Sequence, residues 1–396
     1  VGISSTRFSS YPHEFSGGMR QRLAIGLAIA LDPPLVIADE PTTSLDVAIA
    51  DQVMTELRSL CEDIGSALLL ISHDLALAAR WCERINLLDN GQIVENATSK
   101  EFLINPQSLM GKRIVSAAKA REEKRAIANI HTDLVLEVNR LRCWHALSGF
   151  PWQANWLKAV DEVSFFLHES ETLGIVGTSG CGKTTLCRAL MGLTPIRGGE
   201  VKLQGQNLLN LKGQFLKSSR KSLQMVFQDP FASLNPKMTV AEAISDPLLI
   251  HTSISRLEAF ERDRTLLQQV GLTPPENFQN RLPHELSGGQ QQRVAIARAL
   301  SLEPKVLICD ESVSMLDVEI QAEVLALLHF LQQRLRLSIL FITHDLSVAT
   351  GFCHRLIVLD KGRIVEEGPG KQIFDSPQAA ITRRLVDVCP TLSSMT

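Results

Sequence analysis

One short segment has the residue types and spacing that bind a nucleoside triphosphate. From residue 177 to residue 184 the sequence reads Gly-Thr-Ser-Gly-Cys-Gly-Lys-Thr. Glycines let the backbone amides curl around phosphate groups, and a helix that starts here adds positive potential. Lys183 would supply a positive charge to the β- and γ-phosphates, and the Thr184 hydroxyl suits Mg²⁺. The segment therefore predicts a phosphate-binding loop for ATP and Mg²⁺.

The flanking residues predict the elements that such a loop needs. Residues 172–176 form an apolar run typical of a strand, and residues 186–191 have the composition of a helix. A glycine-rich surface turn would not explain a Lys-Thr pair at this spacing. The strand–loop–helix order therefore favours nucleotide binding over a simple turn.

Two further apolar runs end in polar residues that could act on the bound phosphates. Residues 306–309 are followed by Asp310 and Glu311, and residues 339–342 are followed by Thr343 and His344. The carboxyl ends of parallel strands are where open α/β sheets place their chemistry. We expect Asp310 to hold Mg²⁺, Glu311 to orient or activate the attacking water, and His344 to lie near the γ-phosphate.

Much of this pattern occurs twice in the chain, 271 residues apart (residue 287 against residue 16). Ser-Gly-Gly recurs at residues 16–18 and 287–289, the acid pair at 39–40 and 310–311, and the histidine at 73 and 344. The phosphate loop has no upstream partner. The sequence thus opens in the middle of the first repeat, and we expect the core of that repeat to be partly exposed.

The local patterns predict an α/β fold in both repeats. Short apolar runs predict buried parallel strands, and the residues between them have helical periodicity. The run from Leu23 to Leu31 predicts a segment buried in a core. Mixed charges over residues 117–126 predict a solvated helix or linker. The expected strands are residues 35–38, 67–71, 306–309 and 339–342, and the expected helices are residues 49–60 and 320–335.

Bulk composition excludes several classes of protein. The net charge of −3 gives no general attraction to nucleic acid. The eight cysteines form no CxxC pair, which favours reduced thiols over a metal site. No apolar run approaches the roughly 18 residues that span a bilayer, and the first residues do not resemble a signal peptide. We expect a cytosolic protein that reaches a membrane only through a partner.

These motifs, in this order, resemble the nucleotide-binding domain of ABC ATPases. Residues 177–185 match the Walker A motif, Gln228 the Q-loop, residues 286–290 the signature, residues 306–311 Walker B, and His344 the switch histidine. Within that superfamily, residues 227–236 (Phe-Gln-Asp-Pro-Phe-Ala-Ser-Leu-Asn-Pro) are similar to the oligopeptide, dipeptide and nickel importer group. The resemblance implies P-loop NTPase domains of the ABC type, each with a helical subdomain that bears the signature. We expect a partial domain at 1–115, a charged linker at 116–132 and a complete domain at 133–396.

The resemblance also assigns roles to residues. It implies catalysis by Glu311, His344, Lys183 and Gln228, and Mg²⁺ binding by Thr184, Gln228 and Asp310. Trp144 is the candidate to stack on the adenine, although it could equally serve packing. The implied nucleotide-binding residues are Gly177, Ser179, Gly180, Cys181, Gly182, Lys183, Thr184, Thr185, Trp144, Ser16, Gly17, Gly18, Ser287, Gly288 and Gly289.

Members of the resembled family sandwich ATP between the Walker A motif of one domain and the signature of another. The loop at 177–184 would then face Ser16, Gly17 and Gly18, and the chain would support at most one hydrolytic site. The implied partners are two integral-membrane permease subunits and an extracytoplasmic solute-binding protein, at the cytoplasmic face of the inner membrane. A missing N-terminal half or a homologous ATPase subunit could complete the first repeat. The alternatives are a soluble double-ABC ATPase that resembles a translation factor, and a truncated product.

Overall fold

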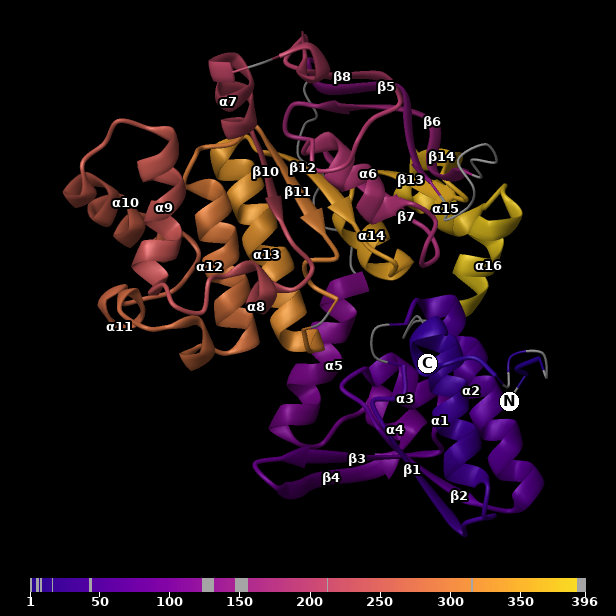
Figure 1. Cartoon of the computed structure of the whole chain (residues 1–396). Helices are drawn as coiled ribbons and strands as arrows, with labels where there is room; N and C mark the ends of the chain where they lie inside the picture. The colour runs from indigo at the N-terminus through magenta and orange to yellow at the C-terminus, as the bar shows by residue number, and fades with distance from the viewer. Residues whose placement is uncertain are drawn as a thin grey trace. The chain divides into compact units, whose positions relative to one another are not determined.

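The computed structural model describes residues 2–4, 7, 9–15, 17–42, 45–122, 132–146, 156–211, 213–314 and 316–389. Ser16 of the predicted site and most of the predicted linker lie outside these residues. The chain divides into two compact units (Figure 1). Unit 1 comprises Val1–Glu123, Asp317–Glu319 and Arg384–Thr396, and unit 2 comprises Lys124–Leu316 and Ile320–Arg383.

Unit 1 alternates helices with short strands. A parallel pair, β1 with β2, and an antiparallel hairpin, β3 with β4, form two separate two-stranded sheets. The elements are η2 Pro12–Glu14, α1 Gly17–Ile29, β1 Leu35–Asp39, α2 Val47–Ile64, β2 Ala67–Ile71, α3 Leu75–Trp81, β3 Arg84–Asp89, β4 Gln92–Thr98, α4 Ser99–Ile104 and α5 Leu109–Glu122.

The first part of unit 2 builds an antiparallel sheet, the phosphate-loop strand and a group of helices. The antiparallel sheet has the strand order β6-β5-β8-β9. The elements are β5 Leu134–Ala146, β6 Trp156–His168, β7 Thr172–Val176, α6 Lys183–Leu190, β8 Gly198–Leu203, β9 Gln206–Asn207, η3 Leu208–Asn210, α7 Gly213–Lys221, β10 Leu223–Val226, α8 Pro230–Ser233, α9 Val240–His251, α10 Arg256–Gln269 and α11 Glu276–Gln279.

The second part of unit 2 repeats the elements of unit 1. Its strands join β7 and β10 in a six-stranded sheet of order β10-β11-β12-β7-β13-β14, in which only the β13–β14 pair is antiparallel. The elements are η4 Pro283–Glu285, α12 Gly288–Leu300, β11 Val306–Asp310, α13 Val318–Leu335, β12 Ser338–Ile342, α14 Leu346–Phe352, β13 Arg355–Asp360, β14 Arg363–Pro369, α15 Gly370–Asp375 and α16 Ala380–Val388.

The repeat that the motifs indicated extends to the main chain. Every strand from β1 to β4 begins 271 residues before its counterpart among β11 to β14. The helix caps also correspond, since Asp74 Oδ1 accepts from the first-turn amides of α3 and Asp345 Oδ1 does the same at α14. Short-range sequence therefore folds both copies in the same way.

The two copies of the repeat differ in how deeply the side chains of their strands are buried. All side chains of β11 and β12 are buried, whereas β1 and β2 alternate between exposed and more buried positions. The main cluster of unit 2 joins these strands to β5, β6, β7, β8, β10 and α6. The prediction of buried strands is therefore confirmed for β11 and β12 and is wrong for the exposed alternate residues of β1 and β2. Those exposed residues agree with the separate expectation that the core of the first repeat is partly exposed.

Two further expectations concern helices of unit 1. The run from Leu23 to Leu31 does not bury as predicted, because Leu27 is 81% exposed and Leu31 is 92% exposed. The charged stretch begins within α5, whose Val115 and Ala118 are buried. Among the described residues, no helix is both long and apolar enough to cross a membrane.

Candidate functional site

The predicted phosphate loop, residues 177–184, follows β7 in unit 2; residues 177–182 connect this strand to α6, which includes Lys183 and Thr184. Two glycines fit places where the main chain of other segments comes very close. A Cβ atom on Gly177 would lie 2.2 Å from the carbonyl oxygen of Leu359, and one on Gly182 would lie 2.0 Å from that of Ala159. Gly182 also has a φ of 114°, a backbone conformation that residues with a side chain rarely adopt. The loop therefore needs glycine for steric reasons as well as for access to phosphates.

Lys183 begins α6 and is 5% exposed. Its Nζ donates to the carbonyl oxygens of Gly177 at 2.7 Å and Thr178 at 3.0 Å, and it lies 3.9 Å from Cys181 Sγ. Burial raises the pKa of the Cys181 thiol, and the nearby Lys183 charge opposes that shift. The loop thus satisfies the buried ammonium group with its own carbonyl oxygens.

Asp310 ends β11 and is 3% exposed, and its Oδ1 atom has no hydrogen-bond partner among the described residues. Burial and the neighbouring Glu311 charge raise the pKa of Asp310 to about 6, against the opposing effects of Lys183, Arg188 and a hydrogen bond from Thr184. The structure thus brings together Asp310 and Thr184, two predicted Mg²⁺ ligands. An orphaned carboxylate oxygen beside a hydroxyl group fits a hard cation that takes oxygen ligands.

No group of three or more His, Cys, Asp or Glu side chains in the described part of the chain could hold a metal ion by itself. A Mg²⁺ ion in nucleotide sites commonly has one or two protein ligands, and phosphate oxygens and water supply the rest. The residues present therefore fit an ion that binds together with a nucleotide.

Two predicted catalytic residues from separate segments, Gln228 and His344, contact a third, Glu311. Gln228 follows β10, and its Nε2 donates to Glu311 Oε2 at 2.9 Å. His344 follows β12, and its Nδ1 lies 3.4 Å from the same oxygen. The Glu311 amide donates to the carbonyl oxygen of Ile342 at 2.9 Å, which fixes the carboxylate at the strand end. The sheet order, which places β11 between β10 and β12, explains why these segments converge.

The protonation of His344 depends on Glu311. Burial lowers the pKa of His344, but the hydrogen bond and charge of Glu311, with a further contribution from Asp345, raise it above its ordinary value overall. The Glu311 carboxylate therefore favours the protonated form of the His344 imidazole. A carboxylate paired with a histidine at a strand end is suited to orienting a water molecule.

The signature segment begins α12. Ser287 caps the helix, since its Oγ accepts from Gln290 N at 3.3 Å and its amide donates to Gln290 Oε1 at 3.0 Å. Ser287 and Gly288 are exposed, whereas a Cβ on Gly289 would lie 2.5 Å from Ile320 Cγ2. In unit 1, Gly17 and Gly18 begin α1 in the same way. The structure thus places an exposed, capped helix N-terminus at the signature of unit 2.

Trp144 lies on β5 opposite Lys158 of β6. The Lys158 ammonium group is 5.0 Å from the centre of the indole ring, a cation–π distance. This contact gives Trp144 a packing partner, and its stacking on adenine remains a prediction. Sequence reasoning missed Lys158, because cross-strand pairing depends on a register that motifs do not reveal.

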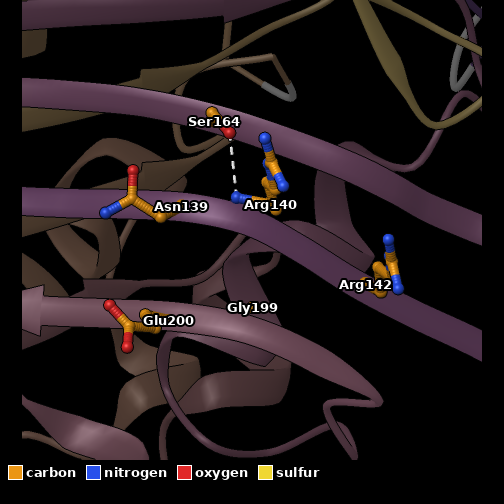
Figure 2. Close-up of a pocket in the computed structure, with 6 residues that line it drawn as sticks. All are labelled: Asn139, Arg140, Arg142, Ser164, Gly199 and Glu200. Carbon is orange, nitrogen blue, oxygen red and sulfur yellow. Dashed lines mark hydrogen bonds between the residues drawn. The ribbon is translucent and has the colours of Figure 1, made fainter.

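A surface pocket of about 520 Å³ lies elsewhere in unit 2, across β5, β6 and β8. Figure 2 shows the pocket where the Arg140 amide donates to Ser164 Oγ at 2.8 Å. The ladder is irregular here, and Arg140 has a φ of 44°. None of the lining residues belongs to the predicted site; they are Asn139, Arg140, Arg142, Ser164, Gly199 and Glu200.

Unit 1 contains a counterpart of the acid–histidine pair. His73 Nδ1 lies 2.6 Å from Glu40 Oε1, and the His73 amide also donates to that oxygen at 3.0 Å. The side chains of His73 and Glu40 are 41% and 34% exposed, against 20% and 15% for His344 and Glu311. A glutamate–histidine pair therefore occurs at the same place in both repeats, with a shorter distance and greater exposure in unit 1.

Comparison with known sequences agrees with these features. The family described as "ABC transporter" matches residues 1–43 and 160–314, which together are half of the chain. The chain is 40% identical over 411 residues to the glutathione import ATP-binding protein GsiA of Pectobacterium atrosepticum, covering 96% of this chain and 65% of that protein. It is 39% identical over 396 residues to the peptidoglycan transport ATP-binding protein YejF of Agrobacterium fabrum, covering 98% and 71%. The chain thus spans about two thirds of the length of these relatives.

Solved structures of ATP-binding cassettes share the fold. A dimeric post-hydrolysis structure of the cassette MJ0796 bound to ADP and Pi has a TM-score of 0.53 and 29% identity, covering 59% of this chain and 98% of that one. CbiO1 of Clostridium perfringens, part of the cbiONQ transporter complex, has a TM-score of 0.53 and 27% identity, covering 62% and 92%. The chain has the α/β fold of P-loop ABC cassettes and belongs to the ABC transporter family of ATP-binding proteins.

Proposed function

We propose that unit 2 binds ATP with Mg²⁺ and hydrolyses it, and that the chain thereby drives solute import through separate membrane proteins. The observation that carries this proposal is the convergence of Gln228, Glu311 and His344, with the phosphate loop on the same parallel sheet. The family membership and the ATP-binding relatives support it.

The proposed reaction is the attack of water on the γ-phosphorus of ATP. The bond to the β,γ-bridging oxygen breaks, and the products are ADP, inorganic phosphate and a proton. Lys183 leaves its two carbonyl partners to bind the phosphates, and Glu311 orients the water and accepts its proton. His344 stabilises the charge of the Glu311 carboxylate and lies at the strand end next to it.

Asp310 and Thr184 would hold Mg²⁺, with Gln228 as a third candidate ligand. An ion held there would neutralise part of the negative charge that develops on the phosphate oxygens during the reaction. Ser179, Gly180 and Thr185 would add backbone or hydroxyl donors around the phosphates, and Trp144 would contact the adenine.

The proposed partners are two integral-membrane permease subunits and an extracytoplasmic binding protein that delivers the solute. The chain would then attach to the cytoplasmic face of the membrane through the permeases. The names of the relatives, glutathione import and peptidoglycan transport, favour peptide-like solutes. The Phe-Gln-Asp-Pro stretch after β10 agrees with that group.

Lys183→Ala tests the enzymatic part of the proposal. We expect ATP turnover, measured by phosphate release, to fall by about 100-fold or more, because the charge that meets the phosphates is lost. Lys371→Ala is the matched control, since Lys371 is an exposed lysine of α15. Turnover of Lys183→Ala close to that of Lys371→Ala would refute ATP hydrolysis by unit 2.

Membrane association tests the transport part. We expect the chain, expressed together with permease subunits of an importer of this group, to sediment with membranes and to leave them when the permeases are omitted. Sedimentation with ribosomes instead would favour a soluble double-ABC ATPase.

A further inference from the structure

The start of β7, the strand that leads into the phosphate loop, is held by side chains of three neighbouring segments. The Ser170 amide donates to Ser338 Oγ of β12 at 3.0 Å. Gln332 Nε2 of α13 donates to the Ser170 carbonyl oxygen at 2.9 Å and to Thr172 Oγ1 at 2.7 Å. The Thr172 amide donates to Nδ1 of His354, just before β13, at 2.9 Å. We call the side chains of Gln332, Ser338 and His354 the strand clamp.

β7 has no free space in which a movement of its start could be absorbed. It lies between β12 and β13 in the six-stranded sheet (Figure 1), and all five of its residues are buried. A Cβ atom on Gly174 would lie 2.4 Å from Leu356 Cδ2 and 2.8 Å from Cys353 Sγ. Close-packed interiors transmit strain, so a shift at Thr172 reaches Gly177, the first residue of the phosphate loop. The clamp therefore helps to set the position of the phosphate loop.

His354 is the member of the clamp that can change its charge. Its Nδ1 accepts from the Thr172 amide, so the neutral ring carries its proton on Nε2. A second proton would occupy Nδ1, and a protonated nitrogen cannot accept a hydrogen bond. Thr172 is 0% exposed, so its amide would then lack an acceptor in a place that water does not reach. Protonation of His354 therefore breaks one attachment of β7, whereas Gln332 and Ser338 do not titrate.

The groups around His354 favour its neutral form at neutral pH. Burial lowers the pKa of His354, and the nearby His329 of α13 lowers it further, whereas the charge of Glu171 opposes these effects. Glu171 is paired with Arg355 at 2.9 Å, and Arg355 also pairs with Glu367 of β14. The sequences of β7, β12 and α14 contain no titratable side chain. Because the pKa of His354 is below its ordinary value overall, the acceptor is in place at neutral pH and is lost as the pH falls.

We propose that His354 is a positioning residue for the phosphate loop, and that its protonation at acid pH releases the start of β7 and weakens nucleotide binding. The inference rests on the proposed function, because it takes the loop after β7 as the site that binds the phosphates of ATP. His354 bonds the first residue of β7 and the loop follows the last, roughly 15 Å away at about 3.3 Å per residue. His354 therefore acts through the strand and not by contact with the nucleotide.

Binding of ADP with Mg²⁺ to the full chain, measured by calorimetry, tests this role without hydrolysis. His354→Asn is the key variant, because the oxygen of its amide takes the place of Nδ1 as acceptor and does not titrate. At about pH 7.5 the Kd values of wild type and variant should agree within about twofold, whereas at about pH 5 the wild-type Kd should be about tenfold higher. Comparing the two proteins at the same pH removes the effects of titrating ADP and other side chains.

His284→Asn is the matched control, since His284 is an exposed histidine outside the clamp. This variant should keep the wild-type change of Kd with pH. Equal Kd values for wild type and His354→Asn at both pH values would overturn the proposal. A pH dependence that His284→Asn removed as well would come from general charge, and it would also overturn the proposal.

Amide exchange of Thr172 tests the structural step separately. His354→Leu removes the acceptor at every pH, so protection of the Thr172 amide should fall by about tenfold or more, and the Kd for ADP at neutral pH should rise by a similar factor. Unchanged protection would show that the hydrogen bond does not hold β7. Faster exchange with an unchanged Kd would show that the clamp does not position the loop. Either result would overturn the proposal, and if His354→Leu does not fold, the comparison of wild type with His354→Asn decides.

Binding of ADP by the wild type at neutral pH separates failure of this inference from failure of the proposed function. Absence of binding would refute the proposed nucleotide site, and the inference would fall with it. Normal binding that neither His354 variant alters at any pH would refute the role of His354 alone and leave the proposed function intact.

Discussion

The pair formed by Glu311 and His344 and the pair formed by Glu40 and His73 are built by the same local rules. The amides of both glutamates donate to the end of the neighbouring strand, at 2.9 Å for Glu311 and 3.0 Å for Glu40, and both glutamates have a positive φ, 45° and 48°. Their surroundings differ, because Glu311 has Gln228 beside it and follows a strand whose side chains are all buried, whereas the strand before Glu40 alternates between exposed and buried side chains. Short-range sequence therefore positions the chemical groups, whereas distant segments provide the environment in which they can act.

The largest expected difference between the pairs is in ATP turnover. Glu311→Gln removes the proposed base and should lower kcat by about 100- to 1,000-fold. Glu40→Gln changes the equivalent residue of unit 1 and should leave kcat within about twofold. Both substitutions are isosteric, so steady-state phosphate release compares the two sites directly. A similar loss of kcat in both variants would show that the two pairs act together, and the proposed difference between the two sites would be wrong.

A smaller difference is expected in stability. Ile342→Ala deletes a side chain that is 0% exposed and should lower the free energy of unfolding by about 3 kcal/mol, through lost burial and a cavity. Ile71→Ala, at the matching position of unit 1, should cost less than about 1 kcal/mol, because that side chain is already 46% exposed. Urea unfolding checks both variants. A large loss for Ile71→Ala would mean that this side chain is covered in solution.

The smallest expected effect is a pH dependence of the Glu311–His344 pair. The folded state raises the pKa of His344, so protonated His344 stabilises the fold below its ordinary pKa of about 6.5. That contribution is lost as the pH rises through the folded-state value. We expect the unfolding free energy of the wild type to fall across this range relative to His344→Gln. If the unfolding free energies of the two proteins changed with pH in parallel, the protonation of His344 would make no contribution to stability.

The sequence predicted where these residues lie on the strands and the helix, because each motif depends on a few neighbouring residues. Gly177, Lys183, Asp310 and His344 lie at the ends of the strands and at the helix start where the apolar runs placed them. The convergence of Gln228 on Glu311 could not be derived from spacing alone. It depends on the order of β10, β11 and β12 in the sheet, which the apolar runs do not encode.

Burial was the weaker prediction, for a physical reason. Ile37 and Ile308 are the same residue type at equivalent positions of equivalent strands, yet their exposures are 60% and 0%. Hydrophobicity reports that a side chain favours burial, but a covering segment must exist for burial to occur. Leu27 and Leu31 of α1 illustrate the same limit on a helix.

The hydrogen bonds from Lys183 to Gly177 and Thr178 have a consequence for ligand selectivity. A ligand that enters the loop must offer the ammonium group more than the two carbonyl dipoles that already solvate it. A neutral acceptor would merely exchange one set of dipoles for another, whereas a polyphosphate brings several formal negative charges. These two hydrogen bonds therefore favour polyphosphates over weakly charged metabolites, and this discrimination does not depend on any contact with the base.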